Sequence, residues 1–300
     1  MMVSIAMITY NHEKYIHEAI KGVLLQETEF NYELVIGEDC STDSTRKICE
    51  EYALRFPNTI RLLPSIQNLG MIPNSVRTAN ACIGKYIAIC EGDDFWTDPY
   101  KLQKQVDFME AHHDVALCFT NSKILDDEKG TMKDWKIPLR SGYYEAHEII
   151  YDLVIPTCSA VYRSEITSYL TSKALNKNYI MFDLITWLTC ADFGKIYCIN
   201  EQMVVYRRHS SSITSNMDID KQIQLIYQHE NILEDFGYKY KLLEQKFLSR
   251  SYLVTGLKCM VALDRRAFNL LFKAFTLNPS MIPSNLLYIL KRFFVSDRSI

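Results

Sequence analysis

The segment "CEGDDFW", residues 90–96, places three carboxylates within four positions, directly after the apolar run "YIAIC". Glu91, Asp93 and Asp94 repel one another unless another charge compensates them. A divalent cation does so, because carboxylate oxygens are preferred ligands of Mg²⁺ and Mn²⁺. Gly92 lets a ligand approach the backbone closely. The segment therefore predicts a divalent metal site, with a solvated acidic turn as the alternative.

Strand-like and helix-like segments alternate through the first 120 residues. Strands are expected at 3–8, "YELVIGED", "IRLLPS", "YIAIC" and "DVALCFTN", and helices at 13–26, from "CSTDST" to about residue 56, and before Gly84. Pro57 ends the second helix. This alternation predicts βαβ units, and hence an α/β fold with a mostly parallel central sheet flanked by helices.

Polar clusters follow three of the expected strands. "TYN" follows the first strand, "EDCSTD" the second and "EGDD" the fourth. In such a sheet, ligands bind beyond the carboxyl ends of the strands, so the three turns are expected to meet at one edge. Residues 123–148 are polar and weakly periodic, which predicts a long connection over the site.

Composition and cysteine usage indicate the class of protein and its compartment. The chain is 48% hydrophobic and 23% charged, as expected of a globular protein. It has no apolar run of about 18 residues, and its first residues lack the features of a signal peptide. The nine cysteines form no CxxC pair. We therefore expect a cytoplasmic protein with neither a disulfide framework nor a zinc site.

The charge is distributed unevenly along the chain. Residues 238–300 carry a net charge of +8, so that the remainder carries −11. The last segment, "SNLLYILKRFF", has an apolar stripe at helical spacing beside Lys291 and Arg292. This helix is expected either to pack on the catalytic domain or to lie peripherally on the inner face of an anionic membrane. Nucleic acid is not an expected partner, because no recognition motif is present.

Taken in order, several segments resemble the bacterial-type family 2 glycosyltransferases, which have the GT-A fold. They are "VSIAMITYNHEKYIHEAIKGVLLQ", "YELVIGEDCSTDST", "NLG", "GKYIAICEGDDFW", "PTCSAVYRSE" and "FDLITWLTCADFGKIYCINEQMVVYRRH". The resemblance implies inverting transfer of a sugar from a nucleoside diphosphate donor, with a UDP-sugar favoured. It also implies Mg²⁺ or Mn²⁺, a glycan or lipid-linked glycan acceptor, and a place in surface polysaccharide or glycan biosynthesis.

The same resemblance implies roles for individual residues. Asp183 stands at the position of the catalytic base, and "EGDD" at that of the DxD-type metal motif, with Glu91 where many relatives have Asp. The metal ligands would come from Glu91, Asp93, Asp94 and His209, and the diphosphate would lie near Arg207, Arg208 and His209. The nucleotide would contact Thr9, Tyr10, Asn11, Glu38, Asp39, Asn68, Lys85 and Asp93.

Most of these residues also have a structural interpretation. Asp39 and Asp183 both stand where a helix N-cap is expected, although Ser41, Thr42 and Asp43 are better placed to cap the helix after Asp39. Trp96 would either stack on the acceptor or on a sugar, or bury area in the core. One of the two arginines is expected to point away. The remaining histidines (12, 17, 112, 113, 147 and 229) have no ligand spacing and are interpreted as structural or surface residues.

These inferences give a domain plan and two rival functions. Residues 1–215 are expected to form the glycosyltransferase domain, with a nucleotide-binding half at 1–120 and an acceptor and catalytic-base half at 121–215. Residues 216–300 are expected to form a helical region. The rivals are another nucleotide-sugar enzyme, such as a nucleotidyltransferase, and an inactive nucleotide-sugar-binding module. The absence of glycine from "TYNHEKY" argues against a nucleotidyltransferase.

Overall fold

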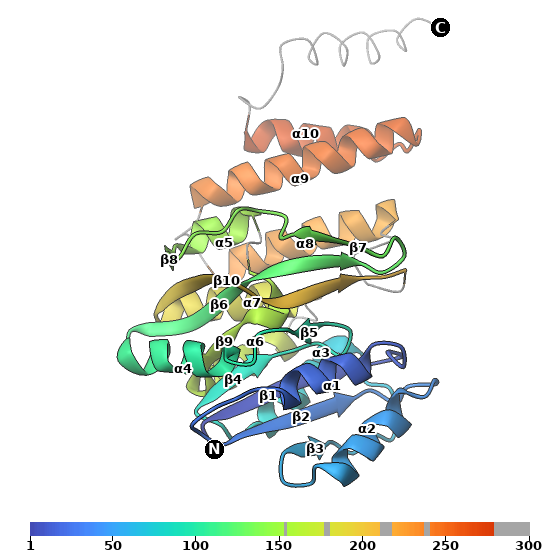
Figure 1. Ribbon diagram of the computed structural model, residues 1–300. Coiled ribbons are helices and arrows are strands. Elements are labelled where there is room, and N and C mark those ends of the chain that lie inside the picture. Colours follow the sequence, from blue (N-terminus) through green and yellow to red (C-terminus); the bar gives the residue numbers. More distant parts are fainter. Residues whose placement is uncertain (153–154, 177–180, 211–217, 237–240, 279–300) are drawn as a thin grey trace, which may run out of the picture. The chain divides into compact units, whose positions relative to one another are not determined.

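The computed structural model describes residues 1–152, 155–176, 181–210, 218–236 and 241–278 (Figure 1). The chain divides into two compact units, Met1–Asn216 and Met217–Ile300. In the first unit the strands are β1 (Val3–Thr9), β2 (Tyr32–Glu38), β3 (Ile60–Leu62), β4 (Tyr86–Ile89), β5 (Phe95–Trp96), β6 (Val115–Asp126), β7 (Thr131–Asp134), β8 (Gly142–Tyr144), β9 (Val161–Arg163) and β10 (Lys195–Arg208). Its α-helices are α1 (Ile16–Leu24), α2 (Thr45–Arg55), α3 (Met71–Ala81), α4 (Lys101–Ala111), α5 (Ala146–Asp152), α6 (Thr167–Asn176) and α7 (Phe182–Phe193).

All these strands belong to one sheet of mixed direction. The order is β3-β2-β1-β4-β9-β6-β10-β5, with β7 beside β6 and β8 beside β10. Strands β1 to β4 pair in parallel, and β10 pairs in parallel with β6. Strand β9 is antiparallel to both β4 and β6, so these two strands run in the same direction. The carboxyl ends of β1, β2, β4, β6 and β10 therefore lie at one edge of the sheet.

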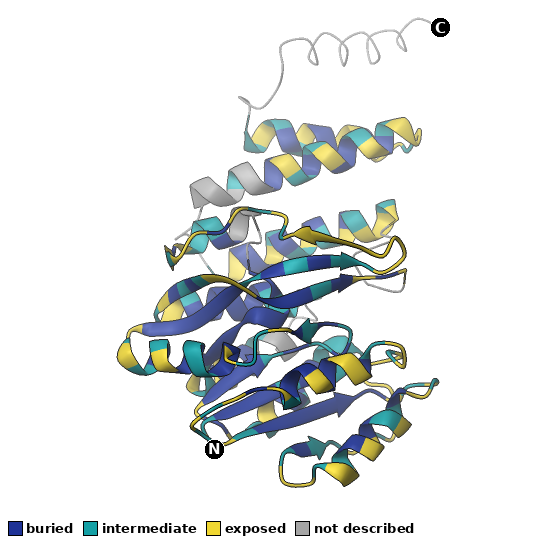
Figure 2. Cartoon of the chain, in the orientation of Figure 1, coloured by how far each residue is buried: buried dark blue, intermediate teal, exposed yellow. Residues whose placement is uncertain are grey.

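Helices cover both faces of the sheet. The connections between parallel strands are right-handed crossovers, so α1 and α2 lie on one face of the sheet. Helix α3 lies on the other face, because the chain reverses direction across the sheet between β3 and β4. Figure 1 shows α1 in front of β1 and β2 and α3 behind them. Because both faces are covered, β2 is buried along nearly its whole length (Figure 2). This explains why its central residues, Leu34–Ile36, are apolar without alternation.

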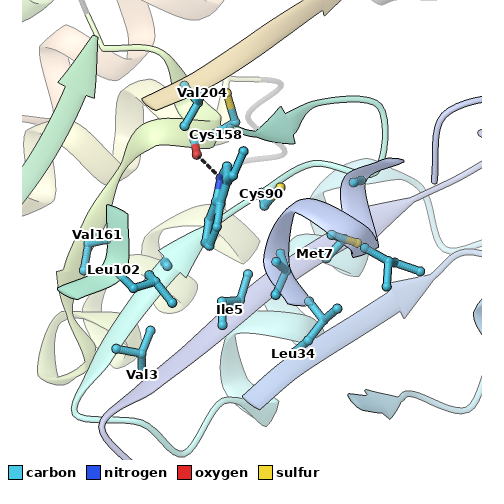
Figure 3. Packing of buried hydrophobic residues seen from close by; sticks show 14 of the residues in the cluster. Val3, Ile5, Met7, Leu34, Cys90, Leu102, Cys158, Val161 and Val204 are labelled. Atoms are coloured by element: carbon cyan, nitrogen blue, oxygen red, sulfur yellow. Dashed lines mark hydrogen bonds between the residues drawn. The ribbon is translucent and has the colours of Figure 1, made fainter. Parts of the chain in front are cut away.

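An extensive apolar core lies between β1, β2, β4 and the helices around them. Val3, Ile5 and Met7 of β1 pack there with Leu34, Leu102 and other buried side chains (Figure 3). Fully burying a side chain of this size stabilises the fold by about 1.5–3 kcal/mol. The core fixes β1 against β2 and β4, and so fixes the turns that follow these three strands.

Two regions differ from what the sequence predicts. Residues 123–148 are not one long connection, because β6 continues to Asp126, turns into β7, and is followed by β8 and the start of α5. All four residues of β7 are exposed, so this edge strand has no apolar alternation to reveal it. The short strand β5 pairs with β10 through Trp96 and Phe95, and its two residues are too few to show a period.

The described part of the second unit is helical, as expected. It contains α8 (Ile219–Asp235), α9 (Lys241–Val261) and α10 (Ala267–Leu277). Asp218 caps α8 by accepting a hydrogen bond of 2.8 Å from the backbone N–H of Lys221. The segment "SNLLYILKRFF" lies outside the described residues. None of the helices that the structure describes combines the length and the apolar character needed to cross a bilayer.

Candidate functional site

The polar turns expected from the sequence do meet at one edge of the sheet. Thr9 ends β1, Asp39 follows β2, and the turn Glu91–Asp94 follows β4. His209 follows the last residue of β10. These strands run in the same direction, so their carboxyl ends bring together residues that are far apart in the chain.

At this edge one carboxylate lies between two imidazoles. The Nε2 atom of His209 is 3.0 Å from Oδ2 of Asp93, and Nε2 of His12 is 3.9 Å from the same oxygen. The two rings meet edge to face with centroids 5.9 Å apart. Tyr15 packs on the ring of His209 with a centroid distance of 4.6 Å. The three side chains form a compact group of nitrogen and oxygen ligands, which we call the His12–Asp93–His209 cluster.

Burial and hydrogen bonding shift the pKa values of His12 and Asp93. Burial lowers the pKa of His12, and the charge of Asp93 only partly offsets this effect. Burial acts to raise the pKa of Asp93, but the hydrogen bond with His209 and the two imidazoles outweigh it and lower the pKa. Neutral imidazole and ionised carboxylate are the forms that bind metal ions.

Buried polar atoms without partners gather around the same turn. Within the described residues, Oγ1 of Thr9, Nδ1 of His12 and Oε2 of Glu91 are buried and make no hydrogen bond. Such atoms carry a desolvation cost of about 1–3 kcal/mol each, so they call for a functional explanation. Gly92 lets the turn approach β1 closely, because a Cβ there would lie 2.5 Å from Oγ1 of Thr9. The ligand set and these atoms together fit a bound divalent cation.

Asp94 has a different environment from Asp93. Its carboxylate is buried and accepts a hydrogen bond of 2.7 Å from the backbone N–H of Arg207. Burial, followed by the charge of Asp93, raises its pKa well above the usual range. Asp94 is not among the three clustered ligands. The metal role of Asp94 stays a prediction. The hydrogen bond from Arg207 connects the acidic turn to β10.

Arg207 is enclosed by protein groups. Its Nε donates to the carbonyl of Asp93 at 2.9 Å, its Nη1 is 2.8 Å from a carboxylate oxygen of Asp127, and its Nη2 pairs with Glu18. The ring of Tyr15 lies 4.9 Å from the guanidinium carbon. Arg207 thus joins four segments of the chain around the cluster, while the side chain of Arg208 is exposed. Of the two arginines predicted to lie near the diphosphate, Arg207 is the one that points inward.

Asp183 lies at the start of α7 and near Glu91. Its Oδ1 accepts a hydrogen bond of 2.8 Å from the backbone N–H of Leu184, and burial raises its pKa. Burial, the charge of Asp93 and, to a smaller extent, the charge of Asp183 raise the pKa of Glu91 to about 8. Because the charge of Asp183 affects Glu91, the predicted base lies in the neighbourhood of the acidic turn.

The turn after β2 is closed by its own hydrogen bonds. The two carboxylate oxygens of Asp39 accept from the backbone N–H groups of Leu69 and Gly70, each at 2.9 Å. Asn68 donates to the Asp39 carbonyl at 2.9 Å. Gly70 has a φ of +85°, a conformation that glycine adopts without strain. Glu38 is buried, accepts from the backbone N–H of Ser41 at 2.6 Å, and so also stabilises this turn.

The "TYN" residues present different groups to the same edge. Thr9 is buried, whereas Tyr10 is 43% exposed. Asn11 has a φ of +54°, and its side-chain oxygen accepts from the backbone N–H of Thr42 at 2.9 Å. The exposed Tyr10 ring is the group in this segment that is available for stacking on a base.

Two predicted ligands are corrected by the structure. Lys85 precedes β4 and therefore lies at the amino ends of the parallel strands, where its ammonium pairs with Glu110 at 2.6 Å and its backbone N–H donates to Met1. It is at the opposite edge from the predicted nucleotide site. Trp96 is only 3% exposed, and its indole N–H donates to the carbonyl of Cys158 at 2.8 Å (Figure 3). Of the two alternatives for Trp96, core packing is correct.

Sequence reasoning missed His12 and the partners of Arg207. His12 directly follows "TYN", and this position beyond the carboxyl end of β1 was the available signal. Glu18 and Asp127 gave no signal, because isolated acids on a helix and in a hairpin turn are common surface residues.

Comparisons with known proteins identify the family. Residues 4–170, more than half of the chain, match the family described as glycosyl transferase family 2. The chain belongs to this family. Membership of a glycosyltransferase family favours the glycosyltransferase interpretation over the nucleotidyltransferase alternative.

Two curated relatives extend the similarity of this glycosyltransferase beyond residue 170. It is 36% identical over 221 residues to the uncharacterized protein Rv1520 of Mycobacterium tuberculosis, an alignment that covers 73% of this chain and 62% of that protein. The glycosyltransferase thus spans less than two thirds of that relative. It is 28% identical to TuaG of Bacillus subtilis, a putative teichuronic acid biosynthesis glycosyltransferase, over 72% of this chain and 82% of that protein.

Two solved structures show the fold of the glycosyltransferase. The structure of residues 1–349 of S. aureus TarS with UDP-GlcNAc superposes with a TM-score of 0.68 at 17% identity, covering 92% of this chain and 80% of that one. The mannosyltransferase PcManGT of Pyrobaculum calidifontis, in complex with GDP-Man and Mn²⁺, gives a TM-score of 0.58 at 14% identity, covering 97% and 78%. The glycosyltransferase thus has the GT-A fold predicted from its sequence.

Proposed function

We propose that this glycosyltransferase transfers a sugar from a nucleoside diphosphate sugar to an acceptor hydroxyl, with a divalent cation and with inversion. The observation that supports the proposal is the His12–Asp93–His209 cluster, beside a turn whose Glu91 feels the charge of Asp183. The solved relatives that hold UDP-GlcNAc or GDP-Man support a nucleotide-sugar donor.

The cluster is the proposed position of the donor diphosphate. A divalent cation held by Asp93 and His209 would neutralise the negative charge that develops on the leaving diphosphate. The exposed Arg208 can add a charge-assisted contact to a phosphate oxygen. Arg207 holds the carbonyl of Asp93 and so maintains the orientation of this turn.

Asp183 is the proposed general base. Its Oδ1 is held by the N–H of Leu184, which orients the carboxylate and leaves Oδ2 to accept the proton of the acceptor hydroxyl. Its raised pKa makes it a better base than an exposed aspartate. Burial keeps Glu91 protonated near neutral pH in the metal-free protein, which disfavours it as a nucleophile for a double displacement. One carboxylate in the position of the base supports direct attack with inversion.

The nucleotide is proposed to lie across the turns after β1 and β2. Tyr10 offers an exposed ring for the base. Thr9 and Asn11 border the same turn. Asp39 keeps lone pairs on its carboxylate oxygens after accepting two backbone N–H groups, and it lies beside Asn68. A UDP-sugar is the preferred candidate for the donor.

The acceptor and pathway are proposed from the relatives. TuaG is named for teichuronic acid biosynthesis, which supports a glycan or lipid-linked glycan acceptor in surface polysaccharide formation. Nine free cysteines support a cytoplasmic location. Contact with the inner face of the membrane through the basic C-terminal segment stays a proposal. The division of residues 1–215 into nucleotide and acceptor halves is a proposal of the same kind.

A hydrolysis assay tests the function. A panel of UDP-, GDP- and dTDP-sugars is incubated with the protein, with and without MnCl₂, and release of nucleoside diphosphate is measured. We expect release from one donor, dependent on the cation. Asp183→Asn should retain donor affinity and lose about 10²–10⁴-fold in turnover.

Asp192→Asn is the matched control, because Asp192 lies on the same helix but is partly exposed and pairs with Lys173. It should keep the turnover of the unmodified protein. Unchanged turnover in Asp183→Asn would remove this residue from the mechanism. Consumption of a nucleoside triphosphate with release of pyrophosphate would contradict the proposed reaction.

A further inference from the structure

Helix α10 of the second unit has three faces, and other helices occupy two of them. Arg266, at the N-cap of α10, and Lys273 are two turns apart and share one face. They form ion pairs with Asp220 and Glu230 of α8. The second face packs on α9, and its buried side chains are Ala267, Leu270, Leu271 and Ala274. Contacts within the unit therefore explain two of the three faces (Figure 2).

The third face of α10 carries two exposed aromatic rings, from Phe268 and Phe272. These side chains are 51% and 59% exposed, and their rings stack with centroids 6.3 Å apart and planes inclined by 17°. A spacing of four residues places the two rings side by side along the helix. Arg265, which is exposed in the turn before α10, adds a cation at this end of the helix. Because both rings are half exposed, neither α8 nor α9 covers this face.

The end of α9 and the turn that follows it are also apolar and exposed. Val254 and Val261 lie seven residues apart on one face of α9 and are both exposed, and Leu263 in the turn is 94% exposed. Arg250 is exposed four residues before Val254, on the same face. We use the name hairpin surface for the exposed apolar side chains of this region: Val254, Val261, Leu263, Phe268 and Phe272. Exposed apolar side chains gathered on one hairpin mark an interaction surface, whereas single exposed residues do not.

The charge of this region indicates which partner the hairpin surface takes. Residues 241–278 contain seven Lys and Arg and two acids, a net charge of +5, and one of these acids, Asp264, pairs with Arg266. Residues 279–300 contain three basic residues and one acid, a net charge of +2. A second copy of the chain, or its own last segment, would therefore bring like charges together. An anionic bilayer supplies both the opposite charge and an apolar interior.

We propose that the hairpin surface docks on an anionic lipid bilayer, with its apolar side chains among the upper acyl chains and Arg250 and Arg265 at the lipid phosphates. An arginine stem is long enough to reach a phosphate while its apolar neighbours lie deeper. Apolar area and positive charge both contribute to such peripheral binding. The inference rests on the membrane contact included in the proposed function, but it assigns this contact to α9, α10 and the turn between them rather than to the last segment. It does not depend on the transfer reaction.

Vesicle flotation with the full-length protein tests the inference without any turnover measurement. The vesicles contain phosphatidylcholine alone or an equimolar mixture of phosphatidylcholine and phosphatidylglycerol. We expect the apparent affinity for the mixed vesicles to be at least about tenfold higher than for the neutral ones, and to fall as NaCl is added. Equal binding to both kinds of vesicle, or binding to neither, would overturn the proposal.

The decisive variant combines Phe268→Ser with Phe272→Ser, which removes both exposed rings of α10. It should lower the affinity for mixed vesicles about tenfold or more, and thermal unfolding establishes that it is folded. The matched control combines Leu54→Ser with Ile66→Ser, at exposed apolar residues of the first unit, and should bind as the unmodified protein does. Arg265→Gln should lose about fivefold in affinity for the mixed vesicles and little for the neutral ones.

A second pair of substitutions, Phe293→Ser with Phe294→Ser, distinguishes the hairpin surface from the last segment in the same assay. If this pair lost vesicle binding and the α10 pair did not, the contact would lie in the last segment and the inference would be wrong. Dimerisation that the α10 pair abolishes, measured by light scattering in the absence of vesicle binding, would assign the surface to a second copy instead. Failure of the proposed function has a different signature. Binding to mixed vesicles that depends on Phe268 and Phe272, without release of nucleoside diphosphate from any donor, would leave the docking surface standing and reject the transfer reaction.

Discussion

Two acidic turns lie at the same edge of the sheet, after β2 and after β4, and they differ in how their carboxylates are used. In the first, "GEDCSTD", the carboxylates of Glu38, Asp39 and Asp43 all accept backbone N–H groups. In the second, "EGDD", one oxygen of Glu91 has no hydrogen bond and Asp93 faces two imidazoles. The first turn uses its charge to stabilise a loop, whereas in the second turn the charge of Asp93 faces two imidazoles and is available for a ligand.

The pKa values follow the same division. Burial acts to raise the pKa of Asp43, but hydrogen bonds from Thr45 and Glu13 outweigh it and lower the pKa. In the second turn burial and the charge of Asp93 raise the pKa of Glu91 to about 8. Acidic composition alone therefore does not distinguish the two turns. They differ in that Asp43 is bound by backbone N–H groups, whereas one oxygen of Glu91 makes no hydrogen bond.

Of the substitutions that test this difference between the turns, removal of Arg207 should have the largest effect, because it should lower both stability and Mn²⁺ affinity. Arg207→Gln leaves the carboxylates of Glu18 and Asp127 without their cation and releases the carbonyl of Asp93. Both acids are partly exposed, so we expect a loss of about 2 kcal/mol in unfolding free energy, below the range for fully buried pairs. Mn²⁺ affinity should also fall.

Chemical denaturation and Mn²⁺ titration measure the two effects, with Arg208→Gln as the control. That control should keep the stability and the Mn²⁺ affinity of the unmodified protein. If Arg207→Gln retained full Mn²⁺ affinity, Arg207 would stabilise the fold without positioning the second turn.

Substitution in the first turn should affect stability and spare metal binding. Asp39→Asn weakens two charge-assisted hydrogen bonds, to Leu69 and Gly70, and should lower the unfolding free energy by about 2 kcal/mol. Denaturant titration gives this value, and Mn²⁺ titration should give the affinity of the unmodified protein. A large loss of Mn²⁺ affinity would show that the two turns are not separate in function.

Substitution of Glu91 should change the unfolding free energy by a smaller amount, and it should raise this free energy rather than lower it. A raised pKa of about 8 means that the folded state binds more protons than the unfolded state between about pH 4.5 and 8. This contribution is fully present below pH 4.5 and is lost as the pH rises through 8. At pH 9, Glu91→Gln should therefore stabilise the metal-free protein by on the order of 1 kcal/mol.

Thermal unfolding of the metal-free protein from pH 5 to pH 9 checks this prediction. The unmodified protein should lose more stability over this range than Glu91→Gln does. If the stability of the two proteins changed equally with pH, the pKa of Glu91 would not be raised in the folded state.

The smallest effect is expected at Lys85, at the opposite edge of the sheet. Lys85→Gln removes a partly exposed ion pair with Glu110 and should leave donor hydrolysis within about twofold of the unmodified protein. A tenfold rise in the KM for the donor would contradict the proposed nucleotide position, because it would mean that the donor binds near Lys85, at the amino ends of the parallel strands.

Much of the fold could be predicted from the sequence because its signals are local. Alternating apolar and amphipathic segments indicated β1 to β4 and the helices between them, and parallel connection then placed the ends of these strands together. Edge strands such as β7 and two-residue strands such as β5 were missed, because exposure or shortness removes the apolar period. The first and last residues of α1 differ from expectation by a few positions, since helix ends carry weak signals.

The site was predictable only in part. Asp93 and His209 could be proposed from residue type and position, but His12 could not be distinguished from a surface histidine. The difference between Arg207 and Arg208 also depends on which side chain faces Asp93, Glu18 and Asp127.

The sequence by itself determined the α/β class, the resemblance to family 2 glycosyltransferases, and the acidic turn after β4. Local periodicity and residue chemistry are sufficient for these. Only the tertiary structure decided that His12 joins Asp93 and His209, that Arg207 is internal, and that Trp96 is buried. The reason is physical: hydrogen bonding and burial depend on neighbours that are distant in the chain, and folding alone determines which residues become neighbours.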